Sequence, residues 1–126
     1  MRFKEWYQVQ EGILPSFRYG NFCGPGPYLD KKTCRTLADG SPPPKPINAV
    51  DASCRQHDLD YCRCKAGSMS GVVGFGNDCT KAADQKMLGT LQKLLQSGEL
   101  DPSAAKAAKT ISRYFGFHNK VMDFRN

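Results

Sequence analysis

The sequence has no long hydrophobic run and no apolar N-terminal leader. No segment approaches the eighteen or so consecutive apolar residues that a membrane-spanning helix needs, so no transmembrane segment is predicted. The stretch from Met1 to Trp6 lacks the apolar core of a signal peptide. A secreted protein with this sequence is therefore expected to be a mature form or an excised domain.

Nucleic-acid-binding motifs are also missing, although the chain is basic. It contains 18 Lys and Arg against 12 Asp and Glu, which gives a net charge of +6 and favours an anionic partner. Because no RNP-like, helix-turn-helix or zinc-finger pattern occurs, nucleic acid is not the predicted partner. An anionic membrane surface is the remaining candidate, and a role of the charge in solubility alone is the alternative.

No CxxC pair occurs among the six cysteines. An even number of cysteines at this density predicts three disulfides, an oxidising compartment and an extracellular location. A zinc site is the alternative, because Cys54, His57, Cys62 and Cys64 lie within eleven residues. The spacing of Cys62 and Cys64 is poor for a shared zinc ligand set, so zinc is the less favoured interpretation.

The length and composition predict one globular domain over residues 1–126. A chain of 126 residues with 40% hydrophobic and 24% charged residues is long enough to bury a single core. No internal repeat and no convincing strand is found, apart from a short hairpin possible in 66–76. The predicted segments are an N-terminal segment (1–18), a loop with a Pro-rich connector (19–46), a helix pair (47–97) and a C-terminal helix and tail (98–126).

Periodicity and capping residues predict a mainly α fold. The expected helices cover 49–63, from 77 or 78 to about 96, and from 101 to about 115. Asn48 is a good N-cap for the first helix, with Asp51 placed like a capping-box acid. The third begins at Asp101 followed by Pro102, an N-cap and a proline at the first helical position. The first two helices are expected to pack as an antiparallel pair.

The first helix carries three chemically informative side chains. His57 and Asp58 are adjacent, and Tyr61 follows one turn after the histidine. Upstream, the glycine-punctuated loop Tyr19–Gly26 is rich in free backbone carbonyls. A base, a hard-metal ligand and a loop that completes an oxygen shell together point to calcium-dependent hydrolysis of an ester.

The second helix supplies a carboxylate on its apolar face. Asp84 shares the three- and four-residue spacing of Met87 and Leu91, and burial there requires a partner. In an antiparallel pair, His57 lies roughly 12 Å before the end of its helix and Asp84 roughly 10 Å after the start of its own. The two side chains are therefore at about the same level, and Tyr61 shares the face of His57.

Each signal has a plainer explanation when taken alone. A His-Asp pair on a helix is more often solvated than catalytic, and a Gly-Pro-Gly stretch is usually a turn. Asp84 could also be misphased by one residue. The occurrence of all three in this order is much less probable by chance.

The two motifs resemble those of the secreted-type phospholipase A2 superfamily. Its calcium loop, Tyr-Gly-x-x-Cys-Gly-x-Gly, matches Tyr19–Gly26, and its catalytic helix, Cys-x-x-His-Asp-x-x-Tyr, matches Cys54–Tyr61. Asp84 is the best match for the aspartate of the second helix. The resemblance covers roughly residues 19–95, and the Gly-Pro-Gly loop is also similar to that of viral capsid phospholipase domains.

The resemblance implies a reaction and roles for the helix residues. A water activated by His57 would attack the sn-2 ester of a glycerophospholipid, releasing a fatty acid and a lysophospholipid. Asp84 would orient the imidazole, and Tyr61 would support Asp84. The enzyme would act as a monomer at a phospholipid surface, with aromatic and basic residues of segment 1–18 either at that surface or packed in the core.

The resemblance also implies a Ca2+ cofactor. Asp58 would bind the ion together with the backbone carbonyls of Phe22, Gly24 and Gly26, and the Gly24 N–H would help to stabilise the oxyanion. The alternative function is a catalytically silent module of the same fold that binds a membrane or a receptor. Such modules typically lose the histidine or the metal carboxylate, and this chain retains both.

The family pattern implies a Cys23–Cys54 disulfide that ties the calcium loop to the catalytic helix. The pairing of the other four cysteines stays open, except that a Cys62–Cys64 bond is sterically poor. The usual staples between the two helices are expected to be missing, because Ser53, Asp60 and Ala83 stand where the family has cysteines. The leucine-rich face of the second helix would then hold the pair together.

Overall fold

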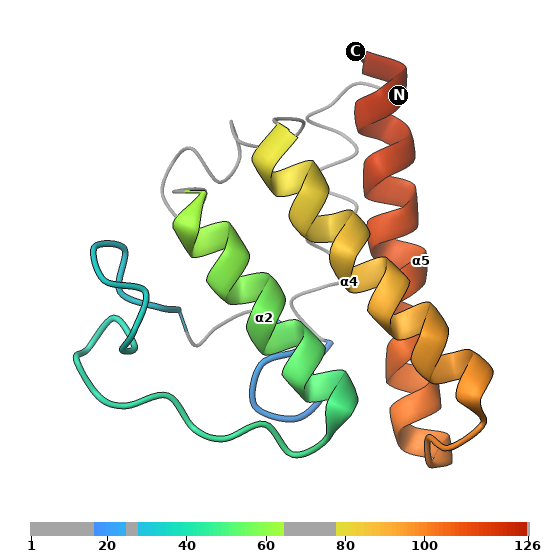
Figure 1. Ribbon diagram of the computed structural model, residues 1–126, viewed down its shortest axis with the longest axis horizontal. Coiled ribbons are helices and arrows are strands. Elements are labelled where there is room, and N and C mark those ends of the chain that lie inside the picture. The colour runs from blue at the N-terminus through green and yellow to red at the C-terminus, as the bar shows by residue number, and fades with distance from the viewer. Residues whose placement is uncertain (1–16, 25–27, 65–77, 126) are drawn as a thin grey trace.

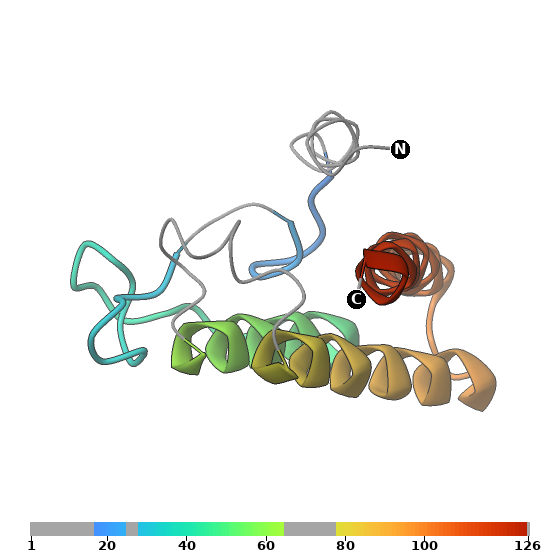
Figure 2. The same ribbon diagram turned by 90° about the horizontal axis from the view of Figure 1, so that it is seen from above.

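The structure is a computed structural model that describes residues 17–24, 28–64 and 78–125. Within these ranges it forms three helices: α2 (Ala49–Arg63), α4 (Asp78–Ser97) and α5 (Pro102–Arg125). α2 and α4 lie side by side in one layer, and α5 packs in a second layer (Figures 1 and 2). The mainly α fold predicted from the sequence is confirmed.

No strand forms in the described part of the chain. Two isolated antiparallel bridges occur there, between Tyr19 and Cys23 and between Leu29 and Leu37. Segment 1–16, Gly26 and the hairpin expected in 66–76 lie outside the described residues.

The bounds of α2 follow from its capping residues. The Asn48 side chain accepts a hydrogen bond from the Asp51 N–H (3.0 Å), as expected of an N-cap. The interpretation of Asp51 as a capping-box acid is wrong in detail. Its carboxylate accepts a hydrogen bond from the Ile47 N–H (2.9 Å), one residue before the cap. Its other hydrogen bonds come from N–H groups of the loop 19–23.

α5 extends well beyond the predicted end near Phe115. Its start is as predicted, because the Ala104 N–H donates to Asp101 (2.8 Å) directly after the cap. The apolar stripe of α5 continues through Ile111 to Phe115, and both contact the core. A single glycine at Gly116 costs a helix only about 1 kcal/mol, too little to end a helix that is already packed.

The core lies between the two layers and reaches the loop. Val50 of α2 and Leu91 of α4 are fully buried, and small residues of α5 such as Ala108 allow close approach. Phe17 and Tyr19 pack against this cluster from the loop side. Of the two alternatives for the aromatic residues of segment 1–18, packing in the core is therefore the one observed for Phe17. The core thus fixes the loop, α2 and α4 relative to one another.

Candidate active site

Two faces of α2 organise the site. One face of α2 carries Asp51, Cys54 and Asp58, which are three and four residues apart. The contacts of Asp51 and Cys54 show that this face is turned toward the loop 19–23. His57 and Tyr61, four residues apart, both contact α4. One helix therefore presents the imidazole to α4 and the Asp58 carboxylate on the neighbouring face.

His57, Tyr61 and Asp84 are in direct contact. His57 Nε2 lies 2.7 Å from Asp84 Oδ1, and the Tyr61 hydroxyl donates to the same oxygen at 2.7 Å. Asp84 is 0% exposed and His57 is 8% exposed. The structure thus places all three side chains where the helix spacing predicts them.

This geometry determines which nitrogen of His57 can act as a base. Because a carboxylate only accepts hydrogen bonds, the Nε2 facing Asp84 carries the proton and donates it. Nδ1 then keeps its lone pair, and it has no hydrogen-bond partner among residues 17–24, 28–64 and 78–125. The arrangement can accept a proton at Nδ1 while Asp84 stabilises the resulting imidazolium.

Aromatic rings surround the imidazole. The centroid of the Tyr61 ring lies 4.3 Å away, and the Phe115 ring meets the imidazole edge-on at 4.7 Å. Burial, followed by the negative charge of Asp84, raises the pKa of Tyr61, so the hydroxyl remains a donor. These contacts fix the ring plane of His57 against Asp84.

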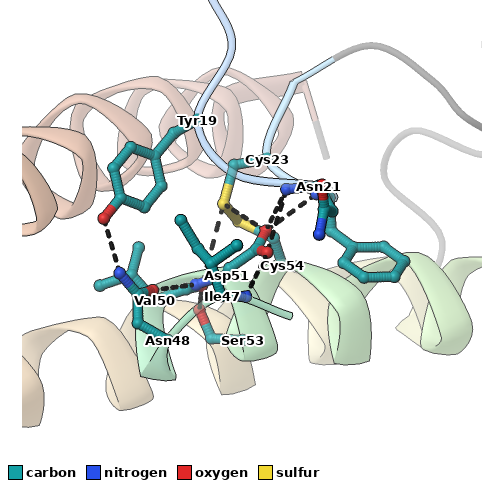
Figure 3. The surroundings of a disulfide bond; sticks show 10 residues. Tyr19, Asn21, Cys23, Ile47, Asn48, Val50, Asp51, Ser53 and Cys54 are labelled. Carbon is teal, nitrogen blue, oxygen red and sulfur yellow. Dashed lines mark hydrogen bonds between the residues drawn. A yellow bond between two sulfur atoms is a disulfide. The ribbon is translucent and has the colours of Figure 1, made fainter. Parts of the chain in front are cut away.

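The loop 19–23 is held on α2 by the Asp51 carboxylate. Asp51 is fully buried and accepts hydrogen bonds from the N–H groups of Asn21 (3.0 Å) and Phe22 (2.8 Å), as well as Ile47. Figure 3 shows these contacts beside the Cys23–Cys54 disulfide. A second short link joins the Asn48 side-chain amide to the Tyr19 hydroxyl (2.6 Å). The loop is therefore fixed to the first turns of α2.

Gly20 is required where this loop passes Asp51. Its φ is +62°, and a Cβ there would lie 2.5 Å from the Asp51 Cγ. We expect Gly20→Ala to lower the free energy of unfolding by about 2–3 kcal/mol, because backbone strain and a clash with a buried carboxylate add. Denaturant unfolding measures this effect.

Gly40→Ala is the matched control for Gly20→Ala. Gly40 also has a positive φ (+87°), but a Cβ there meets nothing within 4 Å. In the control, backbone strain alone should lower the free energy of unfolding, by about 1 kcal/mol. Equal losses at the two glycines would contradict the close approach of Asp51.

All six cysteines form disulfides. The implied Cys23–Cys54 bond is confirmed, and the open pairings resolve as Cys34–Cys62 and Cys64–Cys79. No cysteine is free, so the alternative zinc site has no thiolate ligands. Cys64–Cys79 joins the end of α2 to the start of α4, which links the helix pair at one end.

Asp60, at one of the positions where a cysteine staple is missing, makes polar contacts instead. Asp60 Oδ2 lies 3.6 Å from the Lys86 ammonium, and the Gln56 amide donates to Asp60 Oδ1 (2.9 Å). An exposed ion pair of this kind contributes at most about 1 kcal/mol. The apolar face of α4, with Met87 and Leu91 buried, therefore provides most of the contact between the helices.

The described loop residues fit the donor set expected for calcium. Tyr19 and Cys23 use their carbonyls in the bridge between them, whereas the carbonyls of Phe22 and Gly24 accept no hydrogen bond from the described residues. Gly24 has φ +116°, and a Cβ there would collide with the Phe17 carbonyl, so the tight path requires glycine. Calcium binds such carbonyl oxygens together with carboxylates.

Asp58 is the carboxylate that the sequence predicts for this donor set. Its side chain accepts no hydrogen bond from the described residues, and no cluster of three or more ligating side chains occurs among them. Burial and then the negative charge of Asp51 raise the pKa of Asp58 to about 8. A bound cation is the kind of partner that would favour its charged form.

Two contributors to the site were not predicted from the sequence. The sequence predicts Asp51 as a capping-box acid, but its contacts with Asn21 and Phe22 span about 30 residues. Phe115 was placed at a helix end, although it touches His57. The continuation of the apolar stripe of α5 was the signal that could have identified Phe115.

Comparison with known protein families agrees with the resemblance found in the sequence. A family model described as "Phospholipase A2-like domain" matches residues 13–98, which include the loop, α2 and α4. No curated protein and no solved structure matched the chain. Within the described ranges, no helix has the length and apolar composition needed to span a bilayer.

Proposed function

This chain belongs to the phospholipase A2-like domain family, and we propose that it hydrolyses the sn-2 ester of glycerophospholipids with Ca2+ as cofactor. The products would be a fatty acid and a lysophospholipid. The observation that supports this most strongly is the buried His57–Asp84 pair, which leaves Nδ1 as the accepting nitrogen. Asp58 follows His57 directly in α2.

His57 is the proposed general base. Its Nδ1 takes a proton from a water molecule as the water oxygen bonds to the ester carbonyl carbon. When the tetrahedral intermediate collapses, the imidazolium returns that proton to the departing glycerol oxygen. Asp84 stabilises the positive charge on the ring between these steps and keeps Nε2 as the donor.

Tyr61 is proposed as a positioning residue. Its hydroxyl donates to the Asp84 oxygen that also receives the His57 Nε2–H. This second bond restrains the carboxylate without taking part in proton transfer. Phe115 meets the imidazole edge-on and helps to hold its orientation.

The ligands proposed for Ca2+ are Asp58 and the carbonyls of Phe22, Gly24 and Gly26. When bound, the ion would supply positive charge for the ester carbonyl and the phosphate of the substrate. The Gly24 N–H is the proposed additional donor to the oxyanion. Asp51 and the Cys23–Cys54 bond keep Phe22 and its neighbours on α2.

We expect Asp58→Asn to be more stable than the original protein in EGTA at pH 8. The folded-state pKa of Asp58 is raised to about 8, so its contribution to stability is fully present only below the unfolded pKa, near 4. That contribution is lost as the pH rises toward 8, and asparagine does not titrate. Because one pKa unit corresponds to about 1.4 kcal/mol, the expected gain at pH 8 is several kcal/mol, seen as a clear rise in Tm.

Thermal unfolding between pH 4 and pH 8 tests this expectation, and calcium provides the second arm. The difference in Tm between Asp58→Asn and the original protein should become smaller toward pH 4. Added Ca2+ should raise the Tm of the original protein and leave that of Asp58→Asn unchanged. An Asp58→Asn protein that calcium stabilises equally would contradict the proposed ligand role.

We propose an extracellular location and a phospholipid surface as the site of action. The three disulfides support an oxidising compartment, and the net charge of +6 favours an anionic surface. The position of cleavage can be tested with a phospholipid that carries palmitate at sn-1 and oleate at sn-2. We expect release of oleate and a palmitoyl lysophospholipid; equal release of both acids would contradict the sn-2 assignment.

A further inference from the structure

Residues 28–41 form a compact hairpin that is fixed to α2. The Asp30 N–H donates to the Thr36 carbonyl, and the Ala38 N–H donates to the Tyr28 carbonyl, both at 2.8 Å. The Cys34–Cys62 disulfide attaches the tip to the last turn of α2. Figure 1 shows this cyan segment on the side of α2 that faces away from α4. Its own backbone hydrogen bonds therefore close the hairpin, and the Cys34–Cys62 disulfide attaches it to α2.

A cavity of about 550 Å³ lies between this hairpin and α2. Phe22, Leu29 and Leu59 contribute apolar surface to its lining. Its cationic side chains come from both walls: Lys31, Lys32 and Arg35 from the hairpin, Arg55 and Arg63 from α2. Arg55, Leu59 and Arg63 are spaced by four residues and so share one face of α2. The five basic residues are here called the basic cavity residues.

The basic cavity residues lack acidic partners in the described part of the chain. No carboxylate of residues 17–24, 28–64 and 78–125 lines the cavity, and none of the five basic residues makes an ion pair with these residues. The nearest acid in the sequence, Asp30, accepts hydrogen bonds from the Thr33 N–H and hydroxyl, both at 3.0 Å. These bonds, followed by weaker effects that include the charge of Lys32, lower the pKa of Asp30, so it offsets one positive charge. An excess of positive charge remains.

We propose that this cavity is a binding site for an anion that carries several phosphates. Uncompensated like charges around one cavity repel each other, and a bound polyanion removes that repulsion. Arg55 and Arg63 are roughly 12 Å apart along the helix axis, which exceeds the span of one phosphate. Arginine side chains bind phosphate oxygens in a bidentate manner, and the fixed hairpin reduces the entropy lost on binding.

The proposed anion site is separate from the proposed calcium ligands. The two sites share one residue, Phe22. Its backbone carbonyl is a proposed calcium ligand, and the residue also lines the cavity. The ligand could be the headgroup of a polyphosphorylated lipid or a soluble phosphate compound, since both present the same chemistry. Binding requires neither hydrolysis nor calcium, so this site can be tested independently of the proposed function.

Calorimetric titration of the full chain with inositol 1,4,5-trisphosphate in EGTA and 0.15 M salt tests the site. We expect saturable binding of one molecule per chain. Replacing Arg55 and Arg63 together by glutamine should weaken binding at least about tenfold, because two phosphate contacts are lost. Replacing Lys32 and Arg35 together should weaken it similarly from the opposite wall.

The matched control replaces Lys106 and Lys109 of α5 by glutamine. Both lysines are exposed and neither lines the cavity, so the net charge changes equally. The control should retain its affinity within about twofold. No saturable binding by the original protein, or an equal loss in the control, would overturn the proposal.

Vesicle binding distinguishes the two sources of the ligand. Two kinds of phosphatidylcholine vesicle are compared, one containing phosphatidylinositol 4,5-bisphosphate and one containing phosphatidylserine. The amounts of the two anionic lipids are chosen so that both vesicles carry the same total charge. A preference for the bisphosphate that disappears in the Arg55/Arg63 variant supports the site and assigns a lipid headgroup. Binding of the soluble trisphosphate with no vesicle preference supports the site and assigns a soluble ligand.

Discussion

His57→Gln is expected to lower the rate of sn-2 ester hydrolysis by at least about 10³-fold. Glutamine can still donate a hydrogen bond to Asp84, but it has no nitrogen that accepts a proton from water. Calcium ligands are not changed, so Ca2+ should raise the Tm of the variant as it does in the original protein. Rates on mixed anionic and zwitterionic vesicles, together with the calcium-induced shift in Tm, measure both effects.

The matched control for His57→Gln is His118→Gln, which changes the other histidine of the chain. Its activity should stay within about twofold of the original protein. A loss of less than tenfold in His57→Gln would show that another group takes the proton. A loss of the calcium shift in the same variant would show that the substitution disturbs the loop.

Asp51→Ala is expected to lower the free energy of unfolding by about 3–5 kcal/mol. The substitution leaves the N–H groups of Asn21, Phe22 and Ile47 without their acceptor, and Asp51 is fully buried. Each unsatisfied buried donor costs about 1–3 kcal/mol, reduced where water can enter. Because the same bonds fix the carbonyl of Phe22, stabilisation by calcium should fall as well.

Asp39→Ala is the control for Asp51→Ala. Asp39 also accepts a backbone hydrogen bond, from the Ser41 N–H at 2.9 Å, and it is exposed, so water can replace it. Denaturant unfolding should give a loss of less than about 1 kcal/mol for this variant. Similar losses in the two variants would mean that burial of Asp51 does not determine its contribution.

Local signals in the sequence were sufficient to locate the helices of the site. Asn48 and Asp101 cap α2 and α5 as predicted, because a cap is a contact between residues three apart. The spacing of Asp84 relative to Met87 and Leu91 placed the carboxylate on the buried face. Helix periodicity therefore predicted which side chains would face α2.

Contacts between distant segments could not be predicted in the same way. The role of Asp51 depends on a loop about 30 residues away, and nothing in its local pattern distinguishes that role from capping. The pairing of Cys34 with Cys62 depends on where the hairpin folds back, which the cysteine spacing does not determine. The predicted end of α5 near Phe115 falls short of Arg125, because the apolar stripe through Ile111 and Phe115 packs against the core and stabilises a longer helix.

The resemblance contributed what neither spacing nor geometry provides. It implied the Cys23–Cys54 bond and the assignment of Phe22, Gly24 and Gly26 as calcium ligands. The first is confirmed. The second stays a prediction, supported by the free carbonyls of Phe22 and Gly24, while Gly26 lies outside the described residues.

The most direct test of the proposed enzyme is fatty acid release from mixed anionic and zwitterionic phospholipid vesicles, with Ca2+ and with excess EGTA. We predict release of the sn-2 fatty acid in calcium and its loss in EGTA, with recovery when calcium is restored. No release by a protein that still binds calcium would contradict the proposed hydrolysis. That result would favour a silent module that uses the same fold for recognition.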